Sequence, residues 1–85
     1  MDRRIAYRKL LRIVRRYGVS EKRDRGKGSH RLWERVLPEG RLATAVKCHS
    51  EGQELSAHVV ASIRRRLGLN PGHPHGVSDE EFYAP

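Results

Sequence analysis

Two stretches of this sequence have the apolar spacing of an amphipathic helix, and strand-like segments lie between them. In residues 2–17 apolar side chains recur every three or four positions, at Tyr7, Leu10, Leu11, Val14 and Tyr17. Residues 56–67 repeat the pattern with Val59, Val60, Ile63 and Leu67. A helix with one apolar stripe is stable only when that stripe packs against another layer. The intervening segments therefore have to provide that layer, and a small sheet is expected.

Three strands are predicted between the helices. Residues 19–27 show almost no apolar alternation, so a strand there is expected at a sheet edge. Residues 30–37 alternate more clearly, Pro38-Glu39-Gly40-Arg41 predicts a turn, and residues 42–47 predict the returning strand of a hairpin. The expected fold class is α+β, in the order α-β-β-β-α, with two helices packed on one face of a three-stranded antiparallel sheet.

Polar residues and glycines set the expected ends of the helices. Asp2 is a predicted N-cap of the first helix, and Gly18 is predicted to end it. Ser56 is the predicted N-cap of the second helix. Gly68-Leu69 matches a Schellman ending, and Asn70-Pro71 prevents continuation. A single domain is therefore expected over residues 1–69.

Residues 70–85 are predicted to form a flexible tail. They contain three of the four prolines and the acidic cluster Asp79, Glu80 and Glu81, with few apolar side chains to bury. His73 and His75 are close enough to bind a metal together, but without a nearby third ligand they are interpreted as tail residues.

The net charge of +8 on 85 residues favours polyanionic partners, nucleic acid first. The last sixteen residues contain no lysine or arginine, so the predicted domain is more basic than the whole chain. No stretch approaches the roughly 20 apolar residues that span a bilayer, so no membrane contact is expected. The single cysteine, Cys48, is interpreted as a small buried residue rather than a nucleophile. A cytoplasmic protein without a metal or other cofactor is expected.

The segment Lys27-Gly28-Ser29-His30 contains the residues best suited to bind a phosphate and transfer a proton. Glycines on either side of a lysine let backbone and ammonium approach a phosphate, and His30 would lie beside that phosphate. A histidine there could take a proton from a ribose 2′-hydroxyl or give one to a leaving oxygen. The same four residues are also compatible with a simple turn followed by a solvated histidine.

Residues 7–69 resemble the HicA-type mRNA interferase toxins, small proteins with a double-stranded-RNA-binding-domain-like fold. Four features occur in matching order: the first helix with Leu10-Leu11 and Tyr17-Gly18, Lys27-Gly28-Ser29-His30, Pro38-Glu39-Gly40-Arg41, and His49 followed by Glu54-Leu55, Ser62-Ile63 and Gly68-Leu69. The sequence departs from the family pattern in its longer, more polar residues 19–27, in Arg31 and Trp33, and in its extra tail.

The resemblance implies metal-independent endoribonuclease activity on mRNA, with His30 as the essential catalytic residue. It also implies a HicB-type antitoxin protein that covers this site. His49 and Lys27 could assist His30, although a structural hydrogen bond is the favoured interpretation of His49.

RNA contacts are expected from eight residues. They are Lys27, Gly28, Ser29, Arg31, Trp33, Arg35, Arg64 and Arg65. Trp33 either stacks on a nucleobase or belongs to the core, and the alternation of Leu32 and Val36 against it favours the less buried face. Two alternatives to the ribonuclease stay open: a non-catalytic RNA-binding module of the same fold, and a protein-interaction subunit whose basic face meets an acidic partner.

Overall fold

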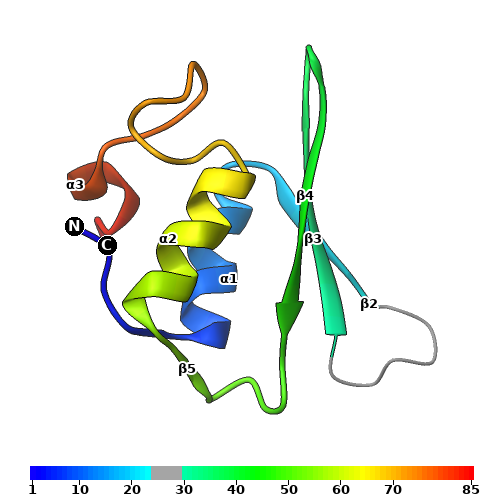
Figure 1. Cartoon of the computed structure of the whole chain (residues 1–85), viewed down its shortest axis with the longest axis vertical. Helices are drawn as coiled ribbons and strands as arrows, with labels where there is room; N and C mark the ends of the chain where they lie inside the picture. The colour runs from blue at the N-terminus through cyan, green and yellow to red at the C-terminus, as the bar shows by residue number, and fades with distance from the viewer. Residues whose placement is uncertain (24–29) are drawn as a thin grey trace.

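Three antiparallel strands form the central sheet, in the order β2-β3-β4. The structure is a computed structural model that describes residues 1–23 and 30–85. The strands are β2 (Val19–Arg23), β3 (His30–Leu37) and β4 (Gly40–Lys47). Helices α1 (Tyr7–Arg15) and α2 (Ala57–Arg66) lie side by side on one face of the sheet (Figure 1). This is the α+β layout expected from the sequence, with the hairpin turn reduced to Pro38 and Glu39.

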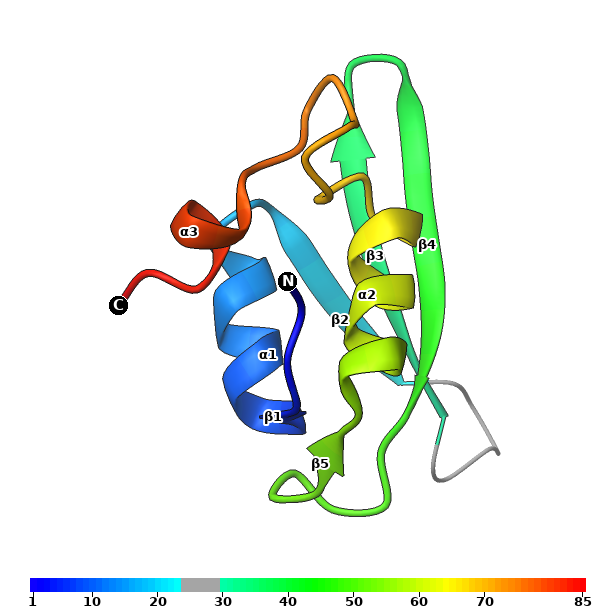
Figure 2. The same ribbon diagram turned by 60° about the vertical axis from the view of Figure 1, so that its left-hand side comes forward.

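Short elements join the two helices and complete the chain. Strands β1 (Ile5–Ala6) and β5 (Glu54–Leu55) pair antiparallel and hold the starts of α1 and α2 together. A one-turn helix, α3 (Asp79–Phe82), packs near the end of α1 (Figure 2). Within residues 1–23 and 30–85, no helix combines the length and apolar character needed to cross a bilayer.

Helix α1 begins at Tyr7, so the prediction that Asp2 caps it is wrong. The N-cap position is Ala6, whose side chain cannot accept a hydrogen bond. The first helical N–H groups instead donate to main-chain carbonyls of the loop before β5: Tyr7 to Gln53 at 2.8 Å and Arg8 to Glu51 at 3.0 Å. A helix start satisfied in this way needs no capping side chain.

The predicted glycines lie in the turns that follow the helices: α1 ends at Arg15, before Gly18, and α2 ends at Arg66, before Gly68. Gly18 has φ +84° and Gly68 has φ +67°, a left-handed conformation that a side chain disfavours. The N–H of Leu69 bonds the carbonyl of Arg64 at 2.7 Å, as in a Schellman motif. Ser56 caps α2 as predicted, because its hydroxyl accepts from the N–H of Val59 at 3.2 Å.

The side of β3 that is buried is opposite to the one that the alternation of apolar residues predicted. Trp33 is completely buried and faces the helices, whereas Val36 is 70% exposed on the opposite face. Local alternation could not decide this, because β3 has apolar residues on both faces and only the helix layer determines which side is covered. The core between the layers includes Tyr7, Leu10, Val14, Trp33, Val46, Val60, Ile63 and Leu67.

Residues 70–85 fold against the helices, so the prediction of a flexible tail is wrong. Phe82 has no exposed surface, and its ring stacks on Tyr17 with centroids 6.2 Å apart. The guanidinium carbon of Arg64 lies 4.2 Å from the centre of the Phe82 ring. Ser78 caps α3 by accepting from the N–H of Glu81 at 3.1 Å. The buried ring of Phe82, together with hydrogen bonds from Arg64 to Asp79 and to the carbonyl of Val77, anchors a segment that is otherwise polar.

We expect Phe82→Ala to lower the free energy of unfolding by about 3–5 kcal/mol, because it removes a fully buried aromatic ring. Urea unfolding followed by circular dichroism measures the change. Glu80→Ala, an exposed position in the same helix, is the control and should change stability by less than about 0.5 kcal/mol. Equal stability of the Phe82 variant and the wild type would mean that residues 70–85 do not pack on the domain.

Candidate functional site

His30 is the first residue of β3 and lies directly opposite Lys47 of β4. Side chains paired in this way are on the same face, with Cβ atoms about 4.5–5.5 Å apart. Because alternate residues of a strand point the same way, His30 shares its face with the exposed Val36. His30 is partly exposed, on the sheet face that α1 and α2 do not cover.

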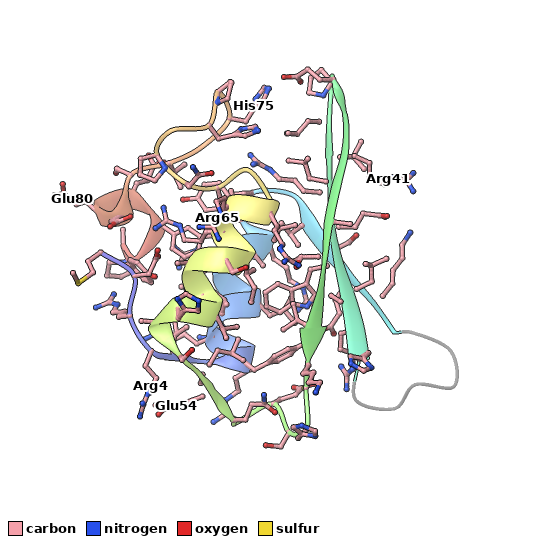
Figure 3. The ribbon with its side chains drawn as sticks, in the orientation of Figure 1. Arg4, Arg41, Glu54, Arg65, His75 and Glu80 are labelled. Atoms are coloured by element: carbon pink, nitrogen blue, oxygen red, sulfur yellow. The ribbon has the colours of Figure 1, made fainter. Side chains whose placement is uncertain are left out.

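We call this surface the helix-free face. By register it carries His30, Leu32, Glu34 and Val36 of β3, Ser20 and Lys22 of β2, and Arg41, Ala43, Ala45 and Lys47 of β4. Figure 3 shows Arg41 pointing away from the helices on this side. Among these described residues three are cations and one is a carboxylate, so the face is basic.

Glu34 joins two of the three cations. Its carboxylate lies 3.0 Å from the ammonium of Lys22 and 3.3 Å from the guanidinium of Arg41. The hydrogen bond from Lys22, together with the charge of Arg41, holds the pKa of Glu34 below its ordinary value. Glu34 therefore stays ionised and keeps two positive side chains, both more than half exposed, on the helix-free face.

Trp33 is a core residue and not a stacking platform for RNA. Its indole Nε1 donates to Glu21 Oε2 at 3.0 Å and lies 3.2 Å from the hydroxyl of Tyr7. The rings of Trp33 and Tyr7 are 5.3 Å apart. With no exposed surface, Trp33 has no ring face available for a nucleobase. The proposed base contact of Trp33 is therefore wrong for this fold.

Glu21 is the acceptor at the centre of this buried cluster. Tyr7 and Trp33 both donate to Oε2, and the guanidinium of Arg31 lies 3.4 Å from Oε1. Burial alone would raise the pKa of Glu21, but the hydrogen bonds from Tyr7 and Trp33 and the charge of Arg31 lower it below the ordinary value. Burial, followed by the bond to Glu21, raises the pKa of Tyr7. Arg31 is thus engaged on the helix side of the sheet, away from His30.

Arg35 is a structural residue and not an RNA contact. It is 6% exposed, and its guanidinium donates to main-chain carbonyls of Tyr17, Leu67, Gly68 and His75 at distances of 2.9–3.2 Å. Burial lowers the pKa of this guanidinium. The side chain joins β3 to the ends of both helices and to the loop before α3.

Arg64 is also structural, which corrects its assignment to the RNA surface. It is 1% exposed and donates to the carboxylates of Asp2 and Asp79 and to the carbonyls of Leu69 and Val77. A sequence signal for this burial exists, because position 64 follows Val60 by four residues and falls within the apolar stripe of α2. Only Arg65 of the predicted pair is exposed (Figure 3).

The proposed phosphate-binding segment, with the predicted RNA contacts Lys27, Gly28 and Ser29, lies outside the described residues.

Lys47 was not predicted as part of the site. The two-residue turn at Pro38 and Glu39 could have identified it, since counting back from Leu37 and Gly40 pairs His30 with Lys47.

Cys48 and His49 directly follow Lys47 in the chain, whereas His75 lies beside Glu39 of the hairpin turn, at the other end of β3 and β4. His49 follows β4 and is exposed, and its main-chain N–H donates to Gln53 Oε1 at 2.6 Å. His75 Nε2 lies 2.6 Å from Glu39 Oε2, and this contact is the first cause that lowers the pKa of Glu39. Cys48 is a free cysteine, 4% exposed, as predicted for a small buried residue. In the part of the chain that the structure describes, no three His, Cys, Asp or Glu side chains cluster closely enough to hold a metal.

Comparisons with protein-family models, curated proteins and solved structures gave no match to this chain.

We expect Glu21→Gln to destabilise the fold by about 1–3 kcal/mol at pH 7, because a buried charge-assisted hydrogen-bond acceptor is replaced by an amide. The wild-type pKa of Glu21 is depressed, so this stabilisation is present above the ordinary pKa of about 4.3 and is lost as pH falls through the folded pKa. The stability difference between wild type and variant should therefore shrink in acid.

Urea unfolding at pH 7 and pH 3 measures this difference. Glu51→Gln, at an exposed loop position, is the matched control and should leave stability unchanged at both pH values. A constant difference between wild type and Glu21→Gln across this range would contradict the role given to the Glu21 carboxylate.

Proposed function

We propose that this chain is a metal-independent endoribonuclease that cleaves mRNA, the toxin component of a toxin–antitoxin pair. The observation that carries the proposal is the pairing of His30 with Lys47 on the basic helix-free face, where the imidazole is partly exposed. The order α-β-β-β-α is compatible with the double-stranded-RNA-binding-domain-like fold that the resemblance implies. The net charge of +8 supports a polyanionic substrate.

His30 has the chemistry for proton transfer at a ribose-phosphate. Its imidazole would take the proton of a ribose 2′-hydroxyl, and the 2′-oxygen would attack the adjacent phosphorus. The bond from phosphorus to the 5′-oxygen would break, which leaves a 2′,3′-cyclic phosphate and a 5′-hydroxyl that takes its proton from water. The ammonium of Lys47 would lie beside the phosphate and stabilise its developing negative charge. Lys27 and the glycines that flank it would add contacts from the segment before β3, and His49 could assist the proton transfer.

The RNA-binding surface proposed here differs from the one expected from sequence. The proposed RNA contacts are on the helix-free face and are Lys22, Arg41 and Lys47. The expected contacts Trp33, Arg35 and Arg64 are buried and are therefore left out. Arg65 and the exposed basic residues of α1 belong to the helix layer and would contact only RNA that extends around the molecule. Phosphate contacts of this kind hold the backbone and carry little sequence information.

An antitoxin protein of HicB type is the proposed partner, and its inhibitory surface would cover His30. His30 is on an open sheet face to which a protein and RNA both have access. A bound antitoxin would therefore block RNA binding by occupying the same surface. A site on an open sheet also fits a chain too short to enclose a deep active site.

We expect His30→Ala to lower the rate of RNA cleavage by about 10²- to 10⁴-fold, the contribution of one positioned acid or base. Cleavage of a labelled mRNA is followed on denaturing gels, and RNA affinity is measured separately. His75→Ala, which changes a histidine in the loop before α3, should retain wild-type cleavage. Unchanged cleavage by a His30→Ala protein with a normal unfolding midpoint would reject the proposed catalytic role.

The same experiment distinguishes the non-catalytic alternative. A wild-type protein that binds RNA but never cleaves it would support an RNA-binding module of this fold. Binding should in that case depend on Lys22, Arg41 and Lys47, and its affinity should fall with salt concentration because counterions are released.

Removal of divalent metal ions should leave the cleavage rate unchanged, because the proposed step uses only a protein acid or base and a lysine. The assay compares cleavage in excess EDTA with cleavage in added Mg²⁺ at constant ionic strength. Loss of activity in EDTA that Mg²⁺ restores would reject the metal-independent mechanism while leaving RNA as the substrate.

A further inference from the structure

The free edge of β4 and one side of α2 border a groove of about 370 Å³. Its apolar lining includes Leu55, Val59 and Ile63, and Val59 is 41% exposed. The cations Lys47 and Arg66 also line it. None of the described lining residues is acidic. The groove thus combines an apolar surface with positive charge.

The edge of β4 offers free main-chain groups along this groove. In antiparallel pairs, residues alternate between bonding their partner and pointing away from it. Leu37 and Gly40 flank the two-residue turn and form a bonded pair. Counting from that pair, the residues of β4 whose N–H and C=O groups point away from β3 are Arg41, Ala43, Ala45 and Lys47. The carbonyl of Lys47 confirms the count, because it accepts from Gln53 Nε2 at 3.2 Å on the side away from β3.

Within residues 1–23 and 30–85, no strand pairs with this edge of β4. The side chains of Arg41, Ala43 and Ala45 are exposed, and Ala45 lines the groove. An exposed strand edge beside an apolar groove is the geometry that proteins use to bind an extended peptide by strand addition.

We infer that the groove between β4 and α2 binds an extended acidic segment of a partner protein, which adds to the sheet as a strand beside β4. Main-chain bonds to Ala43 and Ala45 would hold the segment. Alternate apolar side chains would enter the groove against Val59, and a carboxylate of the segment would pair with Arg66 of α2.

Two other occupants fit these groups less well. The edge presents alternating N–H and C=O groups, whereas phosphodiester oxygens of RNA only accept hydrogen bonds and would leave the carbonyls unpaired. A second copy of this chain would bring Lys47 and Arg66 against the same positive groove, and like charges at an interface are repulsive. An acidic peptide satisfies both the hydrogen-bonding pattern and the charge.

Peptide binding at this groove does not depend on RNA cleavage. By register the side chain of Lys47 is on the proposed catalytic face, so its ammonium is not counted among the contacts of the bound segment. The experiment therefore changes Arg66 and Ala45, which take no part in the proposed cleavage.

The test measures binding of a fluorescent seven-residue peptide of alternating glutamate and valine by fluorescence anisotropy. The comparison probe replaces each glutamate with lysine and should not bind. Arg66→Glu should weaken binding of the acidic peptide at least about tenfold, because it places a like charge in the groove. Arg8→Glu has the same charge change on the exposed side of α1 and should stay within about threefold of wild type.

A second variant tests the main-chain contacts. Ala45→Pro removes one outward N–H without removing a bond to β3, and should weaken binding at least about tenfold. Ala45→Gly keeps the N–H and should bind the peptide as the wild type does. Circular dichroism checks that the proline variant is folded. If it is not folded, the comparison of Arg66→Glu with Arg8→Glu decides whether the peptide binds in the groove.

Four outcomes would reject the inference. The first is equal binding of the acidic and basic peptides, and the second is equal weakening of peptide binding by Arg66→Glu and Arg8→Glu. The third is displacement of the peptide by a short oligouridylate that binds more tightly at the same residues. The fourth is a concentration-dependent dimer in sedimentation that Ala45→Pro abolishes.

Discussion

The burial of Trp33 against Tyr7 and Glu21 sets the orientation of the whole sheet. Side chains along a strand alternate with a period of two, so turning Trp33 toward the helices sends His30 to the opposite face. The same choice turns Lys22, Arg41 and Lys47 to that face through the strand register. A single large ring, with its indole N–H bonded to a buried carboxylate, therefore decides where any chemistry of His30 can take place.

Two of the arginines that give this chain its basic composition have structural roles and do not contribute to a surface for a polyanion. Arg35 and Arg64 are buried and donate to main-chain carbonyls, and Arg64 also pairs with Asp2 and Asp79. A guanidinium has five donors in a fixed plane, which suits it to binding several carbonyls at the junction of separate segments. Each of these side chains hydrogen-bonds the carbonyls of separate segments and so joins them. The charge that remains for a polyanion is therefore concentrated on fewer, exposed positions.

Strand β4 is shared by the two proposed functions. One face of the strand contributes Lys47 to the surface around His30, and its free edge contributes main-chain groups to the groove beside α2. A protein segment bound at that edge would lie next to RNA bound at the helix-free face. Two ligands on one strand could therefore influence each other without any conformational change, through charge and excluded volume alone.

The local sequence determined the helices, their glycine ends, the hairpin and the edge position of β2, because periodicity, turn residues and caps act over a few neighbouring residues. It also singled out His30, although its catalytic role stays a proposal. Only the tertiary structure decided that Asp2 binds Arg64 instead of capping a helix, that Phe82 anchors the last residues, and that Trp33 and Arg35 face inward. These outcomes depend on contacts between positions far apart in the chain, such as Asp2 with Arg64 and Tyr83, and no local pattern contains the partner.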